Sequence, residues 1–401
     1  MVFTLETLGF LASDAGSRAL ERLSSEDLSD ANTLRLLTTL RRDLPPEHAG
    51  AALELARLRL KAVDKFGADA ARMFFTREAL EQASDPLVRR WRAREAAALT
   101  GRDQPALDVC SSIGSDALAF AAAGLRVTGI DIDPVRVLMA RLNADALRLT
   151  ARFETADARD YPLEAAYIFF DPARRDANGR RIFDVEQYQP PLSLVNRFQA
   201  GLWGAKLSPG VDTAQLDPYL HAARLDFISV NGDLKEAQLS HEADEAGGTR
   251  AILLTGEQVL IWEKDQEVQS QVSEPRAWLV EPDPALIRAG LVAHTALAFG
   301  GAQLDETIAY ITTDSKPESP WARAWQVEDW MPFNLKRLRA HLRERGVGRV
   351  TVKKRGTAVT PEELLAKLKL NGSGSRTLVL TRCRGEYIVV ICRDLTTERG
   401  G

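Results

Sequence analysis

The chain has 401 residues, 45% of them hydrophobic and 27% charged, with a formal net charge of −4 at pH 7. This length exceeds that of one typical core, so we expect two or three domains. The balanced composition excludes disordered and fibrous classes. No apolar run reaches the roughly 18 residues that span a membrane, and the N-terminal sequence lacks a signal-peptide pattern, so we expect no membrane association and a cytoplasmic location.

The three cysteines, Cys110, Cys383 and Cys392, are odd in number and lack the spacing of metal ligands. We expect them to be reduced structural thiols, with no disulfide partner and no metal site.

Residues 1–98 predict an α-helical N-terminal domain. Apolar residues recur at helical spacing from Ala51 to Asp64, after a break at Pro45 and Pro46. The end of this region, around Phe74 and Phe75, directly precedes the first predicted strand of the next one.

The second region, residues 99–300, opens with a β-α-β unit. Ala106–Cys110 predicts a buried parallel strand, Ser111–Ser115 a turn of small residues, and Ala117–Ala123 a helix. Leu125–Ile130 predicts a second buried strand, which ends in Asp131. Such a turn lets the backbone approach a ligand, and the acid can accept hydrogen bonds from ribose hydroxyls, so the unit predicts a nucleoside-bearing cofactor. The alternative is an ordinary layer of this kind without a cofactor.

The turn contains a single glycine, Gly114, where dinucleotide-binding turns have three, so we do not expect a pyrophosphate ligand. The spacing of Asp108 and Gly114, followed by Gly-Ile-Asp-Ile-Asp-Pro at 129–134, resembles the first two motifs of class I S-adenosylmethionine-dependent methyltransferases. The resemblance implies a Rossmann-like α/β fold with S-adenosyl-L-methionine as the cofactor.

The same resemblance implies positions for the cofactor. The turn and Asp108 would hold its methionine end, Asp131 its ribose, and Asp157 with Ala158 its adenine, while the segment just before the first strand would fold over the methionine end. The cofactor-binding candidates are therefore Thr76, Glu81, Gln82, Asp108, Ser111, Ser112, Gly114, Asp131, Ile132, Asp157, Ala158 and Asp171. For the upstream segment, the alternative is that Phe74 and Phe75 are packing residues and Glu81 is solvated.

A four-residue apolar strand, Tyr167–Phe170, ends abruptly in Asp171-Pro172-Ala173-Arg174. Because ligands lie at the carboxyl ends of the strands in such sheets, we expect this tetrapeptide beside the cofactor. It resembles the (Asp/Asn)-Pro-Pro-(Tyr/Phe) signature of amino-group methyltransferases, and more closely the Asp-Pro-Ala-Arg variant of relatives that act on RNA. The Asp171 carboxylate and the Pro172 carbonyl can hold the N–H groups of an attacking amine.

The predicted catalytic residues are Asp171, Pro172 and Arg174. The tetrapeptide departs from the signature because Ala173 and Arg174 replace a proline and an aromatic residue, and that aromatic residue would stack on a flipped base. Arg174 and Arg175 can instead hold a phosphate or carboxylate of the substrate. The alternative is that Asp171 and Pro172 only end a strand and begin a turn.

Further elements complete this region. We expect helices at Phe183–Gln199, interrupted by Pro190 and Pro191, and at Pro282–Phe299. We expect strands at Ala205–Leu207 and Arg224–Val230. Three short strands linked as antiparallel hairpins then follow, Glu236–His241, Arg250–Leu254 and Gln258–Glu263.

The C-terminal region is basic. Residues 321–401 hold 17 Lys and Arg against 8 Asp and Glu, a net of +9, so the other 320 residues carry −13. A strand at Ala324–Val327, a helix with a Leu335, Leu338 and Leu342 stripe, a strand at Arg349–Lys353, a helix at Pro361–Leu370 and two final strands predict a β-α-β-α-β-β order. This stretch resembles the THUMP-like C-terminal domain of a bacterial methyltransferase family, and the resemblance covers about Arg57 to Asp394.

We therefore expect a small α+β domain, ferredoxin-like or THUMP-like, at residues 321–396. The name THUMP implies docking onto structured RNA, and the local charge agrees, because cations that neutralise phosphates release counterions. The RNA-binding candidates are Lys336, Arg337, Arg339, Arg343, Lys353, Lys354 and Arg355, of which the last three are the strongest. The alternative is that the basic helix face is only solvated surface.

The sequence predicts an S-adenosylmethionine-dependent methyltransferase that modifies a base nitrogen of tRNA or rRNA. Two alternatives remain open. One is a methyltransferase for a small molecule or a protein, and the other is a non-catalytic RNA-binding protein on a methyltransferase scaffold.

Overall fold

The computed structural model describes residues 3–175, 179–243, 247–264, 266, 268–269 and 271–393. The chain forms two compact units, one made of residues 1–226 with 235–248 and the other of 227–234 with 249–401. The division falls inside three strands, β6 (Arg224–Val230), β7 (Asp233–Glu242) and β8 (Gly248–Thr255). Residues 394–396, which the predicted C-terminal domain includes, lie outside the described residues.

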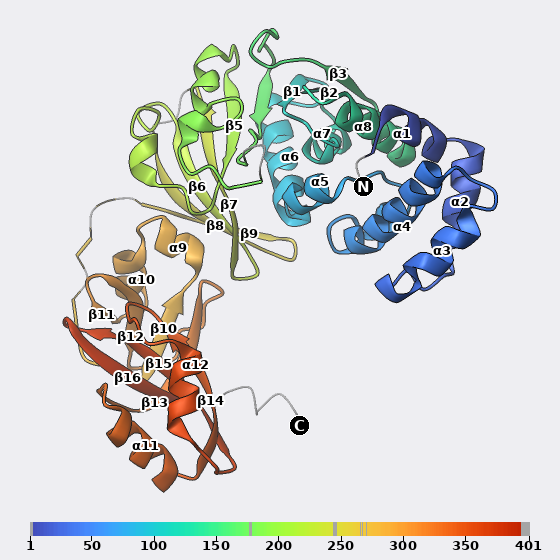
Figure 1. Ribbon diagram of the computed structural model, residues 1–401. Helices are drawn as coiled ribbons and strands as arrows, with labels where there is room; N and C mark the ends of the chain where they lie inside the picture. The colour runs from blue at the N-terminus through green and yellow to red at the C-terminus, as the bar shows by residue number, and fades with distance from the viewer. Residues whose placement is uncertain are drawn as a thin grey trace. The chain divides into compact units, whose positions relative to one another are not determined.

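The first unit begins with helices, as the sequence predicts. They are α1 (Leu5–Ala12), α2 (Asp14–Ser24), α3 (Thr33–Leu40), α4 (Pro46–Phe66), α5 (Arg77–Gln82) and α6 (Pro86–Thr100). Figure 1 shows α1 to α4, in blue, gathered as one group beside α8 (Pro134–Leu147). Leu8 and Leu55 are fully buried in a core that also contains Met139 of α8. The N-terminal helices and α8 thus share one apolar core.

The sheet of the first unit has the order β3-β2-β1-β4-β5-β7. Its strands are β1 (Pro105–Val109), β2 (Arg126–Asp131), β3 (Ala151–Thr155), β4 (Tyr167–Phe170) and β5 (Leu202–Leu207), with β7 last. The strands from β3 to β5 pair in parallel, whereas β7 is antiparallel to β5. Helix α7 (Ser115–Ala122) joins β1 to β2, so the predicted β-α-β unit is confirmed.

Parallel pairing sets the position of the chemistry. All four residues of β4 are buried, as expected for a central strand of a parallel sheet. Because β1, β2 and β4 run in one direction, their carboxyl ends meet at one edge. Asp131 ends β2, Asp171 follows β4, and the Ser111–Ser115 turn follows β1.

The helix predicted at Phe183–Gln199 is wrong. The structure has only two short 3₁₀ helices there, Val185–Gln187 and Leu192–Arg197. Between them, the backbone N–H and carbonyl of Gln189 bond to Ala173 at 3.1 and 3.0 Å, and Pro190 has no N–H to donate. Both the pairing and the prolines prevent a continuous helix.

The second unit contains a seven-stranded sheet of order β11-β12-β10-β13-β16-β15-β14. Its strands are β10 (Trp278–Pro282), β11 (Ala302–Asp305), β12 (Ile308–Thr313), β13 (Ala322–Pro332), β14 (Val347–Lys354), β15 (Gly374–Cys383) and β16 (Glu386–Arg393). The predicted Pro282–Phe299 helix is two helices, α9 (Pro284–Arg288) and α10 (Val292–Ala298), separated at Gly290 with φ +72°. Strand β8 pairs with β9 (Gln258–Glu263) as an antiparallel hairpin.

The predicted β-α-β-α-β-β order of the C-terminal region is confirmed, with α11 (Leu335–Glu344) and α12 (Pro361–Leu368) between the strands. Asn334 caps α11 and Thr360 caps α12 through side-chain bonds to backbone amides. Leu338 and Leu342 of α11 are fully buried against Leu378 and Val389 of the sheet. In the described part of the chain, no helix is long and apolar enough to cross a bilayer.

Candidate active site

A cleft of about 1040 Å³ lies in the first unit, at the carboxyl ends of β1, β2 and β4. Residues of the Ser111–Ser115 turn, the end of β2, the Asp171 segment and the chain before α6 line it together. Sequence-predicted cofactor and catalytic residues from four separate parts of the chain thus surround one cavity.

The turn after β1 is held in an unusual backbone conformation. Cys110 and Ser112 have φ values of +67° and +51°, a region that non-glycine residues rarely adopt, and Gly114 has +81°. A side chain at Gly114 would place its Cβ 3.0 Å from the Phe153 ring. Gly114 does not itself line the cleft, and its freedom allows the chain to enter α7 directly above β3.

Asp131 is fixed by two backbone amides at the mouth of the turn. Its Oδ2 accepts from the N–H of Ser112 and its Oδ1 from the N–H of Asp133, each at 2.9 Å. Burial raises the pKa of Asp131, and the two amide bonds act against that rise. The carboxylate is therefore oriented toward the cleft before any ligand arrives.

Asp108, near the carboxyl end of β1, forms a hydrogen bond that supports the start of α7. Its side chain is buried and accepts a 3.0 Å hydrogen bond from the N–H of Ala117 in the first turn of α7. Burial raises the pKa of Asp108 well above its ordinary value, and repulsion by Asp116 and Asp171 adds to this effect. Asp108 therefore ties the end of β1 to the start of α7.

The Oγ atoms of Ser111 and Ser112 are buried, and neither has a hydrogen-bond partner among the described residues. Unsatisfied buried hydroxyls are costly in a folded protein, so a polar ligand group or an ordered water is the expected partner. Together with the Asp131 carboxylate, these hydroxyls fit the polar amino-acid and ribose groups of a nucleoside cofactor.

The residues predicted to flank adenine also line the cleft. Asp157 forms an ion pair with Arg159 at 2.6 Å, and hydrogen bonds from Arg159 hold the pKa of this carboxyl below its ordinary value. Ala158 is buried. Ile132 also lines the cleft and is 65% exposed, which leaves its side chain available as an apolar contact.

Glu81 and Gln82 line the cleft, whereas Thr76 does not. The Thr76 hydroxyl instead caps α5 by accepting from the N–H of Ala79 at 3.0 Å. Lys65 of α4 holds this segment, because its Nζ donates to the carbonyls of Leu80, Glu81 and Ala83 at 2.8, 2.9 and 2.7 Å. Burial, with repulsion by Lys206 and Arg89, lowers the pKa of Lys65 to about 8.

Asp171, which also lines the cleft, is paired with a lysine that the sequence prediction missed. Lys206 of β5 donates from Nζ to Asp171 Oδ2 at 2.9 Å and to the carbonyl of Gln82 at 3.1 Å, with only 4% of its side chain exposed. Among the described residues, Asp171 Oδ1 has no hydrogen-bond partner. In the sequence, Lys206 is one polar residue in an apolar strand, and only its burial at the end of a strand distinguishes it.

The next residues of the motif also line the cleft. Pro172 is buried, and the backbone of Ala173 pairs with that of Gln189. Arg174 is partly exposed, and its guanidinium forms no ion pair with the part of the chain that the structure describes. Arg174 therefore remains free to contact a substrate anion.

A buried network of charges supports the floor of the cleft. Arg92 of α6 pairs with Asp116 and Glu236, donates to Gln238 Oε1 at 2.7 Å, and lies 4.2 Å from the Phe169 ring centre. Burial acts to raise the pKa of Asp116, but Arg92 and Lys206 hold it below its ordinary value. The network connects α6, α7 and β7 directly beneath β4.

The predicted RNA-binding residues of the second unit fall into two groups. Lys353 and Arg355 donate to Glu281 at 2.9 and 3.3 Å, while Arg339 and Arg343 donate to the carbonyls of Lys367 and Lys369 at the end of α12. By contrast, the exposed side chains of Lys336, Arg337 and Lys354 form no hydrogen bond or ion pair with the described residues.

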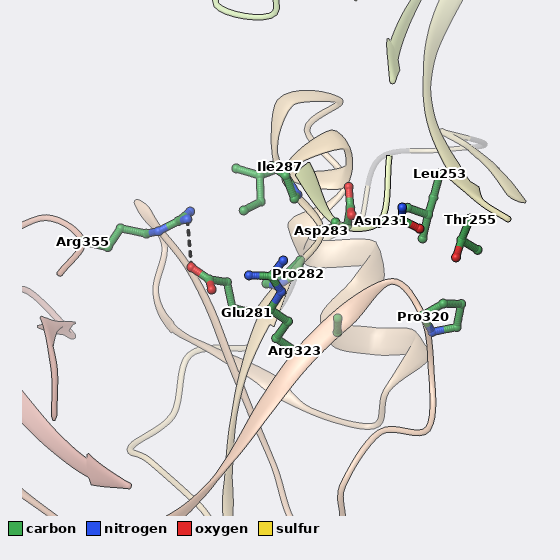
Figure 2. A pocket seen from close by; sticks show the side chains of 13 residues that line it. Asn231, Leu253, Thr255, Glu281, Pro282, Asp283, Ile287, Pro320, Arg323 and Arg355 are labelled. Atoms are coloured by element: carbon green, nitrogen blue, oxygen red, sulfur yellow. Dashed lines mark hydrogen bonds and ion pairs between the residues drawn. The ribbon is translucent and has the colours of Figure 1, made fainter. Parts of the chain in front are cut away.

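The second unit also has a cavity of about 430 Å³, which Figure 2 shows with the Arg355–Glu281 pair on one side. Asp283 and Arg323 line it as well. Within the described ranges, no three His, Cys, Asp or Glu side chains are grouped to hold a metal ion. Cys110, Cys383 and Cys392 are free thiols, and burial raises the pKa of each.

A parallel sheet with a close turn after β1, a carboxylate after β2 and a cleft at the strand ends defines a Rossmann-like nucleoside-binding enzyme. Residues 106–171 match a family described as a methyltransferase domain, and residues 322–394 match one described as THUMP domain-like. Residues 4–62 match a domain of unknown function.

Two proteins from two strains of Mycobacterium tuberculosis, each named an uncharacterized S-adenosylmethionine-dependent methyltransferase, are 35% identical over 339 residues. The alignment covers 82% of this chain and 92% of each relative. The crystal structure of a candidate methyltransferase from Porphyromonas gingivalis shares the fold, with a TM-score of 0.79 over 98% of this chain and 100% of that one at 21% identity. The chain belongs to the family of S-adenosylmethionine-dependent methyltransferases with a THUMP-like region, and S-adenosylmethionine is its cofactor.

Proposed function

We propose that this methyltransferase modifies an amine nitrogen of a base in tRNA or rRNA, and that Asp171 and Pro172 hold the acceptor. The observation that supports this most directly is the Asp171 carboxylate at the end of β4, with Oδ2 bound to Lys206 and Oδ1 unpartnered among the described residues. A fixed acceptor atom of this kind suits an N–H donor. An acceptor of this class would place the protein in the cytoplasm.

The cofactor residues follow from the cleft. The Ser111 and Ser112 hydroxyls and the segment with Glu81 and Gln82 would hold the methionine end, Asp131 the ribose hydroxyls, and Asp157 with Ala158 and Ile132 the adenine. Asp108 and Gly114 would act through the backbone, since Asp108 fixes the start of α7 and Gly114 the turn. Thr76 would act only through the cap of α5.

S-adenosylmethionine supplies a methyl group on a sulfonium sulfur, which keeps the bonding electron pair when the methyl leaves. The acceptor nitrogen forms the new N–C bond with its lone pair and then gives up one proton. Asp171 Oδ1 would accept the N–H, so that the lone pair points along the line of attack, and would receive the proton. Lys206 would hold the Asp171 side chain in one rotamer through its 2.9 Å hydrogen bond to Oδ2, so that Oδ1 stays directed at the acceptor.

RNA docking is assigned to the THUMP-like region, residues 321–396, and catalysis to residues 99–300. The exposed cations without partners, Lys336, Arg337 and Lys354, are the best placed to contact phosphates. Arg339, Arg343, Lys353 and Arg355 would contribute positive potential while they remain bonded within the protein.

The first test is calorimetric titration with S-adenosylmethionine and S-adenosylhomocysteine, with NADH as the control, followed by transfer of labelled methyl groups to unmodified tRNA and rRNA transcripts. Asp171→Ala should bind the cofactor within a few-fold of wild type and abolish transfer, because the acceptor loses its hydrogen bond while Lys206 keeps its bond to the carbonyl of Gln82. Lys206→Met should bind S-adenosylhomocysteine but lower kcat by about ten- to hundred-fold, since Asp171 loses its positioning partner.

Equal loss of cofactor binding and transfer in Asp171→Ala would assign this residue a structural role. Transfer to small molecules or proteins but not to RNA would replace the proposed acceptor. Binding of RNA without cofactor binding would support the alternative of a non-catalytic RNA-binding protein.

A further inference from the structure

The chain that follows Asp171 forms a paired arm beside the cleft. We name residues 173–175 and 179–189 the acceptor arm. The backbones of Ala173 and Gln189 exchange two hydrogen bonds, and the N–H of Ile182 donates to the carbonyl of Arg174 at 2.8 Å. The backbones of Arg175 and Arg181 form an antiparallel β-bridge. These bonds fix the two sides of the arm relative to each other and to the end of β4.

Phe183, on the returning side of the arm, is an exposed aromatic residue in the active-site cleft. Its side chain is 74% exposed, yet it lines the same cavity as Asp171 and Pro172. Among the described residues, no aromatic ring or cation is in contact with it. Large exposed apolar side chains that line a cleft commonly mark a binding surface, and a phenylalanine ring offers a flat face for stacking.

Two arginines of the arm line the cleft with Phe183. Neither the Arg174 nor the Arg181 guanidinium has a hydrogen bond or ion pair with the described residues, whereas Arg175 donates to the carbonyl of Gly179 at 3.0 Å. Free guanidinium groups bind phosphate oxygens in a bidentate manner. An apolar ring and two free cations that line one cleft complement one class of ligand, a nucleotide whose base stacks while its neighbouring phosphates are neutralised.

We propose that Phe183 stacks on the target base, that Arg174 and Arg181 bind the phosphates on either side of it, and that the acceptor is therefore a nucleotide turned out of an RNA loop. This inference rests on the proposed function, because it requires an RNA acceptor. Phe183 would supply the aromatic ring that the Asp-Pro-Ala-Arg motif lacks at its last position. The acceptor arm that carries Phe183 directly follows Pro172, and both residues line the same cavity as Asp171, so a stacked base would lie in the cleft that contains Asp171.

The test uses the full-length protein, tritiated S-adenosylmethionine and a pool of unmodified tRNA and rRNA transcripts. Phe183→Ala and Phe183→Leu should both lower kcat/KM for RNA by about ten- to hundred-fold, the range expected for loss of one stacked base. Phe183→Trp should keep it within about three-fold. Affinity for S-adenosylhomocysteine should not change in any of the three, which also shows that they are folded.

Leu34→Ala is the matched control, because Leu34 of α3 is 77% exposed and lies outside the cleft. It should retain wild-type transfer. Arg174→Ala and Arg181→Ala should raise KM for RNA and reduce its dependence on salt.

Two results would overturn the inference while the proposed function survives. One is wild-type kcat/KM in Phe183→Ala, and the other is full activity in Phe183→Leu, which would show that apolar volume suffices without a ring. If the wild-type protein binds its cofactor but transfers methyl groups to no RNA, both the proposed acceptor and this inference fail. If Phe183→Ala does not fold, the comparison of the Leu and Trp variants decides.

Discussion

The cleft of the first unit and the basic region of the second both depend on charge, but they hold it differently. At the cleft, Arg92, Lys206 and Lys65 each donate to several acceptors and hold other residues of the site in place. On α11 and β14, partnered cations such as Lys353 stand beside exposed ones without partners, such as Lys336.

The difference teaches that the number of charges in a segment does not tell which of them can meet a ligand. The segment from Asn334 to Gly356 contains nine Lys and Arg and one acid, and this composition predicts a positively charged surface. The contacts then divide these cations into those that hold the fold and those that remain available. The predictions below test that division, beginning with the largest effect.

Arg92→Met should destabilise the first unit most. It leaves Asp116 and Glu236 buried without their cation, and breaking a buried pair in this way costs about 3–5 kcal/mol. Denaturant unfolding followed by circular dichroism measures the change. Arg22→Met is the control, because its pair with Asp43 is exposed and should contribute less than about 1 kcal/mol. Similar small losses of unfolding free energy in both variants would contradict the structural role assigned to Arg92.

The two groups of cations in the second unit should respond differently to removal. Replacing Lys336, Arg337 and Lys354 by Ala together should weaken RNA binding by roughly ten-fold or more and reduce its salt dependence, by about one unit of slope per lost contact. Replacing Lys353 and Arg355 should change the slope less but lower the thermal stability, because Glu281 loses both of these cations. Binding isotherms from 50 to 200 mM salt, with melting curves of each variant, compare the groups. Equal slopes for the two sets would contradict the assignment.

The smallest effect is expected from the titration of Lys65. Its folded pKa of about 8 lies below its ordinary 10.5, so between these values the unfolded chain binds more protons and this group's contribution to the unfolding free energy rises with pH. Affinity for S-adenosylhomocysteine should fall a few-fold over the first part of this window, because a neutral amine can no longer donate to Leu80, Glu81 and Ala83 together. Calorimetry from pH 7 to 9 measures this, and Lys65→Met should show neither trend.

Much of the fold was predictable because local patterns agree with the tertiary structure. Tyr167–Phe170 is a strand with the predicted bounds, and the order of elements after Ala322 follows from periodicity and caps. The helix predicted at Phe183–Gln199 failed because its composition favours a helix, whereas the pairing of Gln189 with Ala173 is a tertiary contact that composition does not reveal.

Some residues of the candidate site were likewise predictable from the sequence, and others were not. Asp131 and Asp171 follow apolar strands, and that position is visible in the sequence. Lys206 and Phe183 carry no comparable signal, because one is a lysine within a strand and the other belongs to a segment without regular structure. Their relevance depends on which residues the fold brings to the cavity, and this requires the coordinates.

The Arg92 network also has a consequence for the order in which the protein is made. Arg92 lies 144 and 146 positions before Glu236 and Gln238, its partners on β7. A ribosome that adds about 5–20 residues per second would produce the two ends of this network on the order of ten seconds apart. During that interval, the nascent chain carries an arginine whose carboxylate partner on β7 does not yet exist, so the floor of the cleft is completed late in synthesis, after the helices that surround it.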